Sequence, residues 1–315
     1  MAAENKKEWV FIVNPIAGNG FGAKYHPKVL EMIRQYGIDA EVVLTESHGH
    51  ASELAKQYAD NGFRYIIGVG GDGTLNEISV PLVGNKNVII GIIPAGTGND
   101  FIQILGLPDR FTDEDWKTFF SLNVIPMDVG CVNGQYFING MGLGFDAQVA
   151  ARNYVKPGET RMGGKGKYVW HIVSTLLFFK EKKVIIKSNG NTKVDNCFIN
   201  TISIGRRFAG GFYLTPKAIA NDGLLDVCSI KKLNLFERFK LLLMVPKGTH
   251  INDHRVHYYQ TDRISLEFTE EVPFHVDGEL FFAKNFDVSV LPGALNFIYN
   301  PAGKHFFRTD LLRET

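Results

Sequence analysis

Cysteine and long uncharged runs are both scarce in this chain of 315 residues. Only Cys131, Cys197 and Cys228 occur, without the paired spacing of a disulfide framework or a zinc site. The longest stretch without a charged residue, 129–145, has 17 residues, including five glycines and two asparagines. A membrane-spanning helix needs ~20 mostly apolar residues. These scarcities predict a protein of a reducing compartment that has no membrane span.

Net charge is also low, because the chain has 34 lysines and arginines and 33 aspartates and glutamates. A balance of +1 argues against a protein that binds nucleic acid along its whole chain. Residues 1–9 lack the apolar segment of a secretory signal, so we expect a cytoplasmic protein. Hydrophobic residues at 45% and charged residues at 21% are ordinary for a globular chain.

Glycine is the residue in excess, with 33 copies, several of which directly follow short apolar runs. In the first 129 residues such runs alternate with helical patterns, which predicts an α/β domain of three layers, a parallel sheet covered on both faces. Beyond 129 short β-like runs predominate, interrupted by helical patterns near 167–180 and 234–244. The second part is therefore expected to be a β-sandwich-like antiparallel domain with a few helices.

The segment Gly70-Gly71-Asp72-Gly73-Thr74 follows a predicted strand and opens a predicted helix. Glycines let backbone N–H groups approach a phosphate, and a helix N-terminus favours an anion. A carboxylate inside such a cradle would repel phosphate unless a cation lay between them, so Asp72 points to a nucleotide with Mg²⁺. The alternative is an ordinary Asp-Gly turn.

Two further loops, 14–18 and 96–100, follow other predicted strands. Asn-Pro and Gly-Thr-Gly-Asn are common turn sequences, so each loop is a weak signal alone. At the carboxyl edge of one parallel sheet, however, three such loops converge on one crevice. Neither G-x-G-x-x-G nor the P-loop motif follows the first strand, so we predict a nucleotide site of neither common type.

These motifs together resemble the bacterial diacylglycerol kinase family of soluble lipid kinases, which also contains sphingosine and ceramide kinases. The resemblance lies in Asn14-Pro15, in the segment 70–76 and in the segment 94–101, and it continues in Asn221-Asp222-Gly223 and Val276-Asp277-Gly278-Glu279. It implies an ATP-binding domain of residues 1–129 plus 299–315, because the chain end returns to the first domain in this family. Residues 130–298 would form the domain that binds lipid and supplies the catalytic base.

The resemblance also implies roles for individual residues. Those expected around ATP are Asn14, Pro15, Ile16, Ala17, Gly18, Thr45, Gly70, Gly71, Asp72, Gly73, Thr74, Leu75, Asn76, Thr97, Asn99 and Asp100. Asp72 and Asp100 would act through the catalytic metal or its hydration shell. A structural Mg²⁺ would use the Asp222 carboxylate and the backbone carbonyls of Ile219 and Leu224; the alternative is a surface Asn-Asp-Gly turn that joins two strands.

Asp277 and Glu279 form the expected base region, because a lipid hydroxyl needs a carboxylate to accept its proton. Asp277-Gly278 also has the sequence of a hairpin turn. If the segment is extended, the two carboxylates share a strand face, and a turn at Gly278 separates them. The sequence leaves open which of the two takes the proton.

The expected function is transfer of the ATP γ-phosphoryl group, with Mg²⁺, to a lipid hydroxyl such as that of diacylglycerol, giving phosphatidic acid. The base region would reach the nucleotide cleft from the second domain. A sphingoid-base, ceramide or other lipid-alcohol kinase, an NAD kinase, and a non-catalytic nucleotide- or lipid-binding protein remain alternatives. The lipid partner implies transient, peripheral membrane contact, and a sheet edge in the second domain could pair two copies into a homodimer.

Several other residues have less specific patterns. The segment 167–183 has an apolar and aromatic centre between lysines, which fits either a membrane interface or, as the favoured reading, a helix packed on the β domain. Basic residues are expected to complete the phosphate site or to be solvated: Arg161, Lys165, Lys167, Arg206 and Arg207. The histidines His250, His254 and His257 lack metal spacing and are expected at the surface.

Overall fold

The computed structural model describes residues 7–153 and 165–310, apart from the side chains of 153 and 165–169. It divides into two compact units. The first contains 1–129, 219–223 and 291–315, and the second contains 130–218 and 224–290. The division at 129 lies where the sequence pattern changes. The first unit resumes at Leu291, earlier than the expected 299, and it also includes the short segment Ile219–Gly223.

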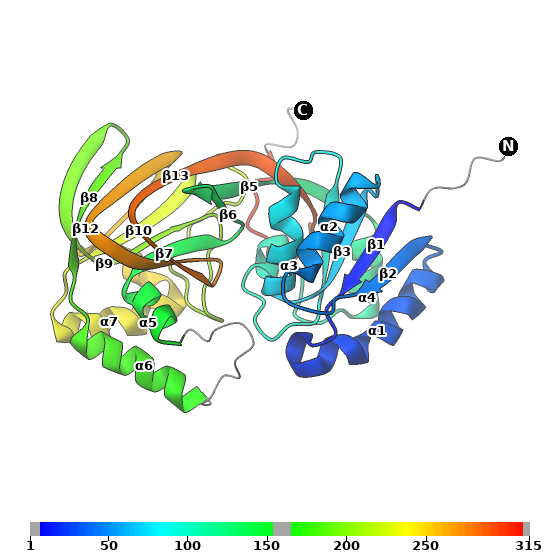
Figure 1. Cartoon of the computed structure of the whole chain (residues 1–315), viewed down its shortest axis with the longest axis horizontal. Helices are drawn as coiled ribbons and strands as arrows, with labels where there is room; N and C mark the ends of the chain where they lie inside the picture. The colour runs from blue at the N-terminus through cyan, green and yellow to red at the C-terminus, as the bar shows by residue number, and fades with distance from the viewer. Residues whose placement is uncertain (1–6, 154–164, 311–315) are drawn as a thin grey trace. The chain divides into compact units, whose positions relative to one another are not determined.

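The first unit is built on a parallel sheet whose strands follow the order β2-β1-β3-β4, with the end of β13 beside β4 (Figure 1). Its elements are β1 (Trp9–Val13), α1 (Ala17–Gln35), β2 (Ala40–Leu44), α2 (His50–Asp60), β3 (Tyr65–Gly70), α3 (Asp72–Ser79), η1 (Val80–Leu82), β4 (Ile89–Pro94), η2 (Ile102–Leu105), α4 (Asp113–Phe120) and the start of β5 (Val124–Val132).

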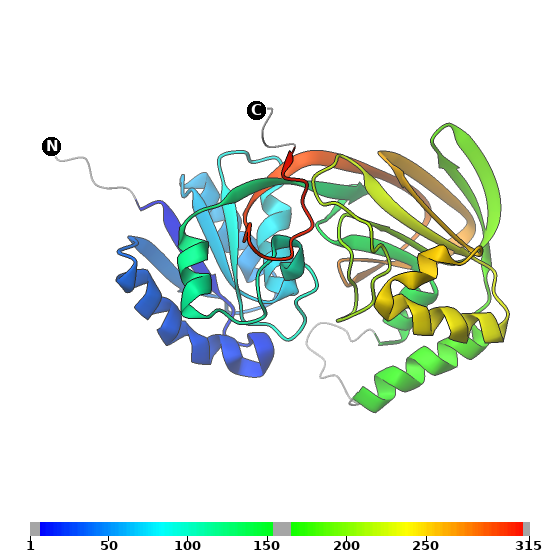
Figure 2. The same cartoon turned by 180° about the vertical axis from the view of Figure 1, so that it is seen from behind.

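Helices cover both faces of this sheet (Figures 1 and 2). On one face Phe11 of β1 packs with Met32 of α1 and Trp116 of α4 in a single buried cluster. Because side chains alternate along a strand, Val10 and Ile12 point to the other face, where α2 and α3 contact β1 and β3. Burial on both faces explains why these strands read as continuous apolar runs.

The second unit is mostly antiparallel, with strands in the order β11-β10-β9-β7-β12-β13, while β8 pairs with β9 and β12. Its elements are β6 (Gln135–Phe137), β7 (Gly140–Gly144), α5 (Phe145–Asn153), α6 (Lys165–Phe178), β8 (Lys182–Ser188), β9 (Asn191–Ser203), β10 (Leu225–Lys231), α7 (Leu235–Met244), η3 (Val245–Lys247), η4 (Thr249–Asn252), β11 (Val256–Thr261), β12 (Arg263–Val276) and β13 (Glu279–Ile298).

One apolar cluster joins the helices of this unit to its sheet. Phe145 of α5, Leu176 of α6 and Leu241 of α7 pack in it with Phe198 and Ile230 of the strands. The segment 167–183 therefore does pack on the β domain through one face of α6.

The surface expectation for the three histidines is wrong for His250. This residue is fully buried, and its Nε2 lies 3.2 Å from the carbonyl oxygen of Leu214 and 3.6 Å from Cys228 Sγ. Burial lowers the pKa of His250 below its usual value, although the contact with Leu214 opposes the shift. A buried neutral imidazole with a backbone acceptor is a packed core group.

Candidate active site

Three loops of the first unit meet at the carboxyl ends of β1, β3 and β4. Asn14 Nδ2 donates to Thr74 Oγ1 at 3.0 Å, joining the loop after β1 to helix α3. The amide N–H groups of Ala95 and Gly96, after β4, donate to the carbonyl of Gly70 at the end of β3, at 2.7 and 3.1 Å. The structure thus brings the three glycine-containing loops together.

Glycine is required where these loops touch. A Cβ on Gly96 would lie 2.4 Å from the Cα of Gly71, and a Cβ on Gly18 would lie 2.3 Å from the carbonyl oxygen of Ala95. Gly18 also has a φ of +60°, in the left-handed region. The φ angles of the next two residues, Asn19 at +57° and Gly20 at +86°, are positive as well. Backbone therefore packs against backbone with no side chain between, which leaves amide groups accessible to a ligand.

Asp72 joins two of the loops through its carboxylate. Oδ2 accepts the N–H of Asp100 at 2.7 Å, and Oδ1 accepts the N–H of Phe101 at 3.3 Å. Burial raises the pKa of Asp72 to about 7, and the charge of Asp100 adds to this, while the backbone donors act in the opposite direction. A cation beside this carboxyl group would favour its ionised form.

The predicted nucleotide residues divide into exposed and buried ones. Thr74, Asn99 and Asp100 are buried, and the Leu75 side chain belongs entirely to the core. Thr45 is buried next to the end of β1, where its N–H donates to Val13 at 2.9 Å. Gly70 is also buried. The residues of the set that are exposed or partly exposed are Asn14, Pro15, Ile16, Ala17, Gly18, Gly71, Asp72, Gly73, Asn76 and Thr97.

Arg110 is a cation at this junction that the sequence analysis did not identify. Its guanidinium donates to the carbonyl of Gly96 at 3.1 Å and lies 4.3 Å from the centre of the Phe21 ring. The preceding Asp109 accepts from the side chain of Asn99 at 3.0 Å. Arg110 stands about ten residues beyond the motif, so no local pattern connects it with the loops.

In the second unit, Asp277 and Gly278 form the two-residue turn between β12 and β13. Val276 pairs with Glu279, and both turn residues have positive φ, +47° and +96°. This is the hairpin alternative, so the turn separates the two carboxylates. The Asp277 carboxylate accepts three backbone N–H groups, from Ile138 at 2.7 Å, Asn139 at 3.1 Å and Gly140 at 2.8 Å. Glu279 is exposed.

Of the expected metal ligands, Ile219 and Asp222 belong to the first unit and Leu224 to the second, and Asp128 contacts this loop at Gly223. The buried Asp128 carboxylate accepts the N–H groups of Gly223 and Gly293, both at 2.7 Å. Burial raises the pKa of Asp128, and the charge of Asp222 contributes to the increase. Among the residues that the structure describes, no group of three or more histidine, cysteine, aspartate or glutamate side chains could hold a metal ion.

The basic residues of the second unit have structural contacts. Arg206 donates to the carbonyl of Ala218 at 2.7 Å, and Arg207 lies over the ring of Tyr213. Arg161 lies outside the described residues, as do the side chains of Lys165 and Lys167. No helix within the described ranges is long and apolar enough to cross a membrane.

Comparisons with known proteins agree with this arrangement of two units. Residues 8–132 match the diacylglycerol kinase catalytic domain, and residues 139–299 match the YegS C-terminal NAD kinase beta sandwich-like domain. A diacylglycerol kinase catalytic domain followed by this β-sandwich-like domain defines a lipid kinase of two domains.

Relatives along most of the chain specify the family. The diacylglycerol kinase of Bacillus subtilis is 32% identical over 270 residues, which are 85% of this chain and 88% of the relative. That of Staphylococcus saprophyticus is 28% identical, covering 87% and 89%. A crystal structure from Bacillus anthracis, described as a candidate diacylglycerol kinase, superposes with a TM-score of 0.78 at 28% identity and covers 96% of this chain and 98% of its own. The chain belongs to the diacylglycerol kinase family of lipid kinases.

Proposed function

We propose that this protein transfers the γ-phosphoryl group of ATP to the hydroxyl of a membrane lipid, with diacylglycerol as the acceptor and phosphatidic acid as the product. The observation that carries the proposal is the junction of three glycine loops closed by the Asp72 carboxylate. Phosphoryl transfer depends on positioning and on charge stabilisation rather than on covalent chemistry by the protein. A junction with accessible backbone amides at a helix start suits both needs.

ATP would occupy the exposed side of this junction. The N–H groups of residues 71–74, at the start of α3, are the proposed phosphate donors, together with those of the loop around Thr97. The exposed guanidinium of Arg110 adds a positive charge beside the same loops. Asp72 and Asp100 would act on the nucleotide side through a metal ion, and such a cation would favour the ionised form of Asp72, whose pKa burial raises to about 7.

The residues present fit the proposed structural Mg²⁺. The ion takes carboxylate and carbonyl oxygens, which Asp222 and the backbone of Ile219 and Leu224 would supply. The charge of Asp222 also disfavours ionisation of the buried Asp128, so a cation at Asp222 would relieve that repulsion. When bound there, magnesium supplies positive charge that keeps the 219–223 loop in place.

Glu279 is the proposed base. The Asp277 carboxylate already accepts three backbone N–H groups, which use most of its hydrogen-bonding capacity. A carboxylate bonded in this way is fixed within the turn, whereas Glu279, two residues further on, is exposed to solvent. Asp277 then shapes the turn that carries Glu279.

A radiolabelled-ATP assay over a panel of acceptors tests the function. Diacylglycerol, a sphingoid base, ceramide, a monoacylglycerol and NAD are offered separately, with Asp72→Ala as the inactive control. We expect label in phosphatidic acid with wild-type protein only. NADP formation without any lipid product would mean that the acceptor is NAD and not a lipid. NAD is included because the second unit matches a domain described as NAD kinase beta sandwich-like. Tight ATP binding without turnover would support a non-catalytic protein instead.

A further inference from the structure

Two helices of the second unit expose large apolar side chains to solvent. Phe236 and Leu243 of α7 are each 79% exposed, and Trp170 of α6 is 66% exposed. The full set, called here the α6–α7 apolar surface, consists of Trp170, Leu177, Phe178, Leu235, Phe236, Phe239 and Leu243. The two helices contact each other and run side by side in both views of the chain (Figures 1 and 2).

The exposed residues follow helical periodicity. Phe236, Phe239 and Leu243 are spaced three and four residues apart, so they form one stripe along α7. The buried residues of the same helix, Arg238 and Leu241, lie on the opposite stripe. The inner face of α7 is already covered by the second unit, so its outward apolar stripe is a second surface, and exposed apolar patches of this kind mark interaction sites.

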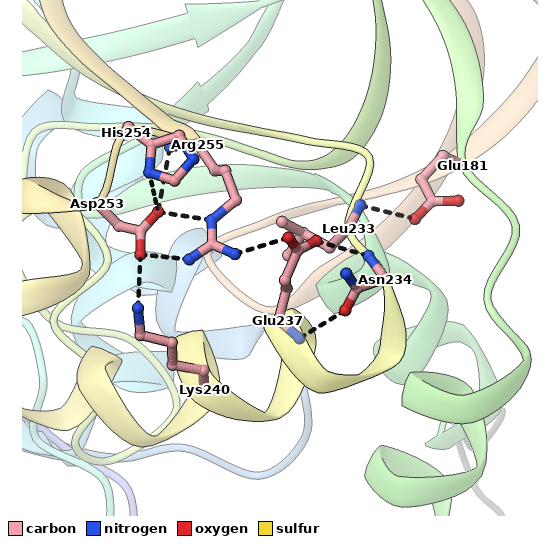
Figure 3. Close-up of polar contacts among 8 residues, drawn as sticks. All are labelled: Glu181, Leu233, Asn234, Glu237, Lys240, Asp253, His254 and Arg255. Carbon is pink, nitrogen blue, oxygen red and sulfur yellow. Dashed lines mark hydrogen bonds and ion pairs between the residues drawn. The ribbon is translucent and has the colours of Figure 1, made fainter.

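Polar contacts hold α7 in place (Figure 3). Asn234 and Glu237 form a capping box, with the Glu237 N–H donating to Asn234 Oδ1 at 3.0 Å. Arg255 lies 2.8 Å from Glu237 and 2.6 Å from Asp253, and Lys240 lies 3.4 Å from Asp253. These ion pairs fix α7 to the segment before β11.

Arg238 connects α7 to the end of α6. Its guanidinium donates to the carbonyls of Leu176 at 2.6 Å and Phe179 at 3.0 Å, and it pairs with Glu181 at 2.7 Å. Because Arg238 and Glu181 are both almost fully buried, this contact fixes the relation between the two helices. The α6–α7 apolar surface is therefore carried by a rigid pair of helices rather than by a loop.

The charges around this surface are positive. The acidic residues of the region, Glu181, Glu237 and Asp253, all lie in ion pairs with arginine or lysine. Exposed lysines flank both helices, and these are Lys180, Lys183, Lys232 and Lys247. Apolar and aromatic side chains bordered by lysines are the composition that binds an anionic lipid surface. Two copies of this chain meeting face to face would instead bring like charges together.

We propose that the α6–α7 apolar surface docks the second unit onto an anionic lipid bilayer. Phe236, Phe239, Leu243 and Trp170 enter the interface, while the lysines contact the lipid headgroups. The physiological use of this contact rests on the proposed lipid kinase activity, since such an enzyme must reach an acceptor held in a bilayer. The contact itself requires neither ATP nor turnover.

Flotation of the full chain with vesicles, in the absence of ATP, measures the contact directly. Vesicles of phosphatidylcholine with 30% phosphatidylglycerol are compared with phosphatidylcholine alone. We expect binding to the anionic vesicles, weakened by salt because the lysine contacts are screened. The double variant Phe236→Ser/Leu243→Ser should bind on the order of tenfold more weakly. Val194→Ser, which removes an exposed apolar side chain from β9, is the matched control and should bind like wild type.

Trp170 supplies a second readout, because the other two tryptophans, Trp9 and Trp116, are buried. Emission should shift to the blue when anionic vesicles are added, and Trp170→Phe should abolish the shift without abolishing flotation. Equal binding by wild type and the double variant would overturn the proposal. So would a wild-type dimer that the double variant disrupts while neither protein binds vesicles. If the wild-type protein binds vesicles but has no kinase activity, the proposed function is wrong and the proposed docking surface still holds.

Discussion

At the scale of single residues, two carboxylates two positions apart have different environments. In Asp277→Asn the amide oxygen can still accept the N–H groups of Asn139 and Gly140, but the N–H of Ile138 would face the amide N–H₂, so this variant should lose about 1–3 kcal/mol of the free energy of unfolding as well as activity. Glu279→Gln changes an exposed side chain, so its stability should match wild type while kcat falls about 100-fold or more. Urea denaturation and steady-state kinetics measure the two effects.

The contrast between these variants identifies the base. If Glu279→Gln keeps its kcat while Asp277→Asn loses activity with no loss of stability, then Asp277 accepts the proton and our assignment of Glu279 is wrong. Glu279→Asp serves as the conservative control, since it keeps the charge and only shortens the side chain.

The buried imidazole of His250 predicts a pH dependence of stability. Its folded-state pKa is lowered, so between neutral and mildly acidic pH the unfolded chain binds a proton that the folded chain does not. The free energy of unfolding should therefore fall as pH decreases from 7 to 5, by up to ~1.4 kcal/mol per pH unit from this group. His250→Gln should flatten the curve, and His254→Gln, at a largely exposed side chain, should leave it unchanged. Denaturation at each pH measures this, and equal slopes in wild type and His250→Gln would contradict it.

Sequence reasoning at this scale identified residues inside local motifs as candidates and missed those brought in by the fold. Asp72 stands in a glycine motif. Asp128 and Arg110 stand outside any motif, and only the fold brings Asp128 to Gly223 and Gly293 and brings Arg110 to Gly96. His250 appeared solvated because no apolar periodicity surrounds it, yet the 3₁₀ turn η4 directs it into the core.

At the scale of elements, the contact between the loops after β3 and β4 depends on Gly96. Gly96→Ala would place a methyl group 2.4 Å from the Cα of Gly71, so the loops must separate. We expect a loss of about 1–3 kcal/mol and weaker ATP binding. Gly98→Ala is the control in the same loop, because nothing lies within 4 Å of its Cβ position. Thermal unfolding without ligand, followed by ATP titration, separates the effects. Equal stability of the two variants would mean that the loop contact is not tight.

The elements themselves were largely predictable where apolar runs alternate with helical patterns. The sequence does not predict β7, because three of the residues in Gly140–Gly144 are glycines, which are typical of loops. Glycine is needed there, since a Cβ on Gly142 would collide with Asp146 and His275. The sequence of β12 contains two separate β-like runs, 263–268 and 273–276, and the register with β13 shifts between Glu267 and Val272, where they join. Bulges of that kind follow from pairing and leave little trace in composition.

At the scale of the whole molecule, the first unit is assembled from three separate segments of the chain. The last segment belongs to it because the end of β13 pairs with β4, where Phe297 lies opposite Ile90. A boundary inside a continuous strand has no linker, turn or change of composition to reveal it. This is why the expected return at 299, based on resemblance, differs from Leu291 in the structure.

The strand β13 contributes to both units, which allows a paired test of their independence. Phe297 is fully buried in the first unit, with its ring 5.5 Å from that of Phe101, whose N–H donates to Asp72. Phe286 is equally buried in the second unit, against Phe274.

Each substitution of Phe297 or Phe286 by alanine should lower the free energy of unfolding by about 3–5 kcal/mol. Phe297→Ala should lower the melting temperature of the transition that ATP raises and weaken ATP binding, because it removes support behind the Asp72 contact. Phe286→Ala should lower the other transition and leave ATP affinity unchanged. Calorimetry with and without ATP distinguishes them, and a single transition lowered equally by both variants would mean that the two units unfold as one.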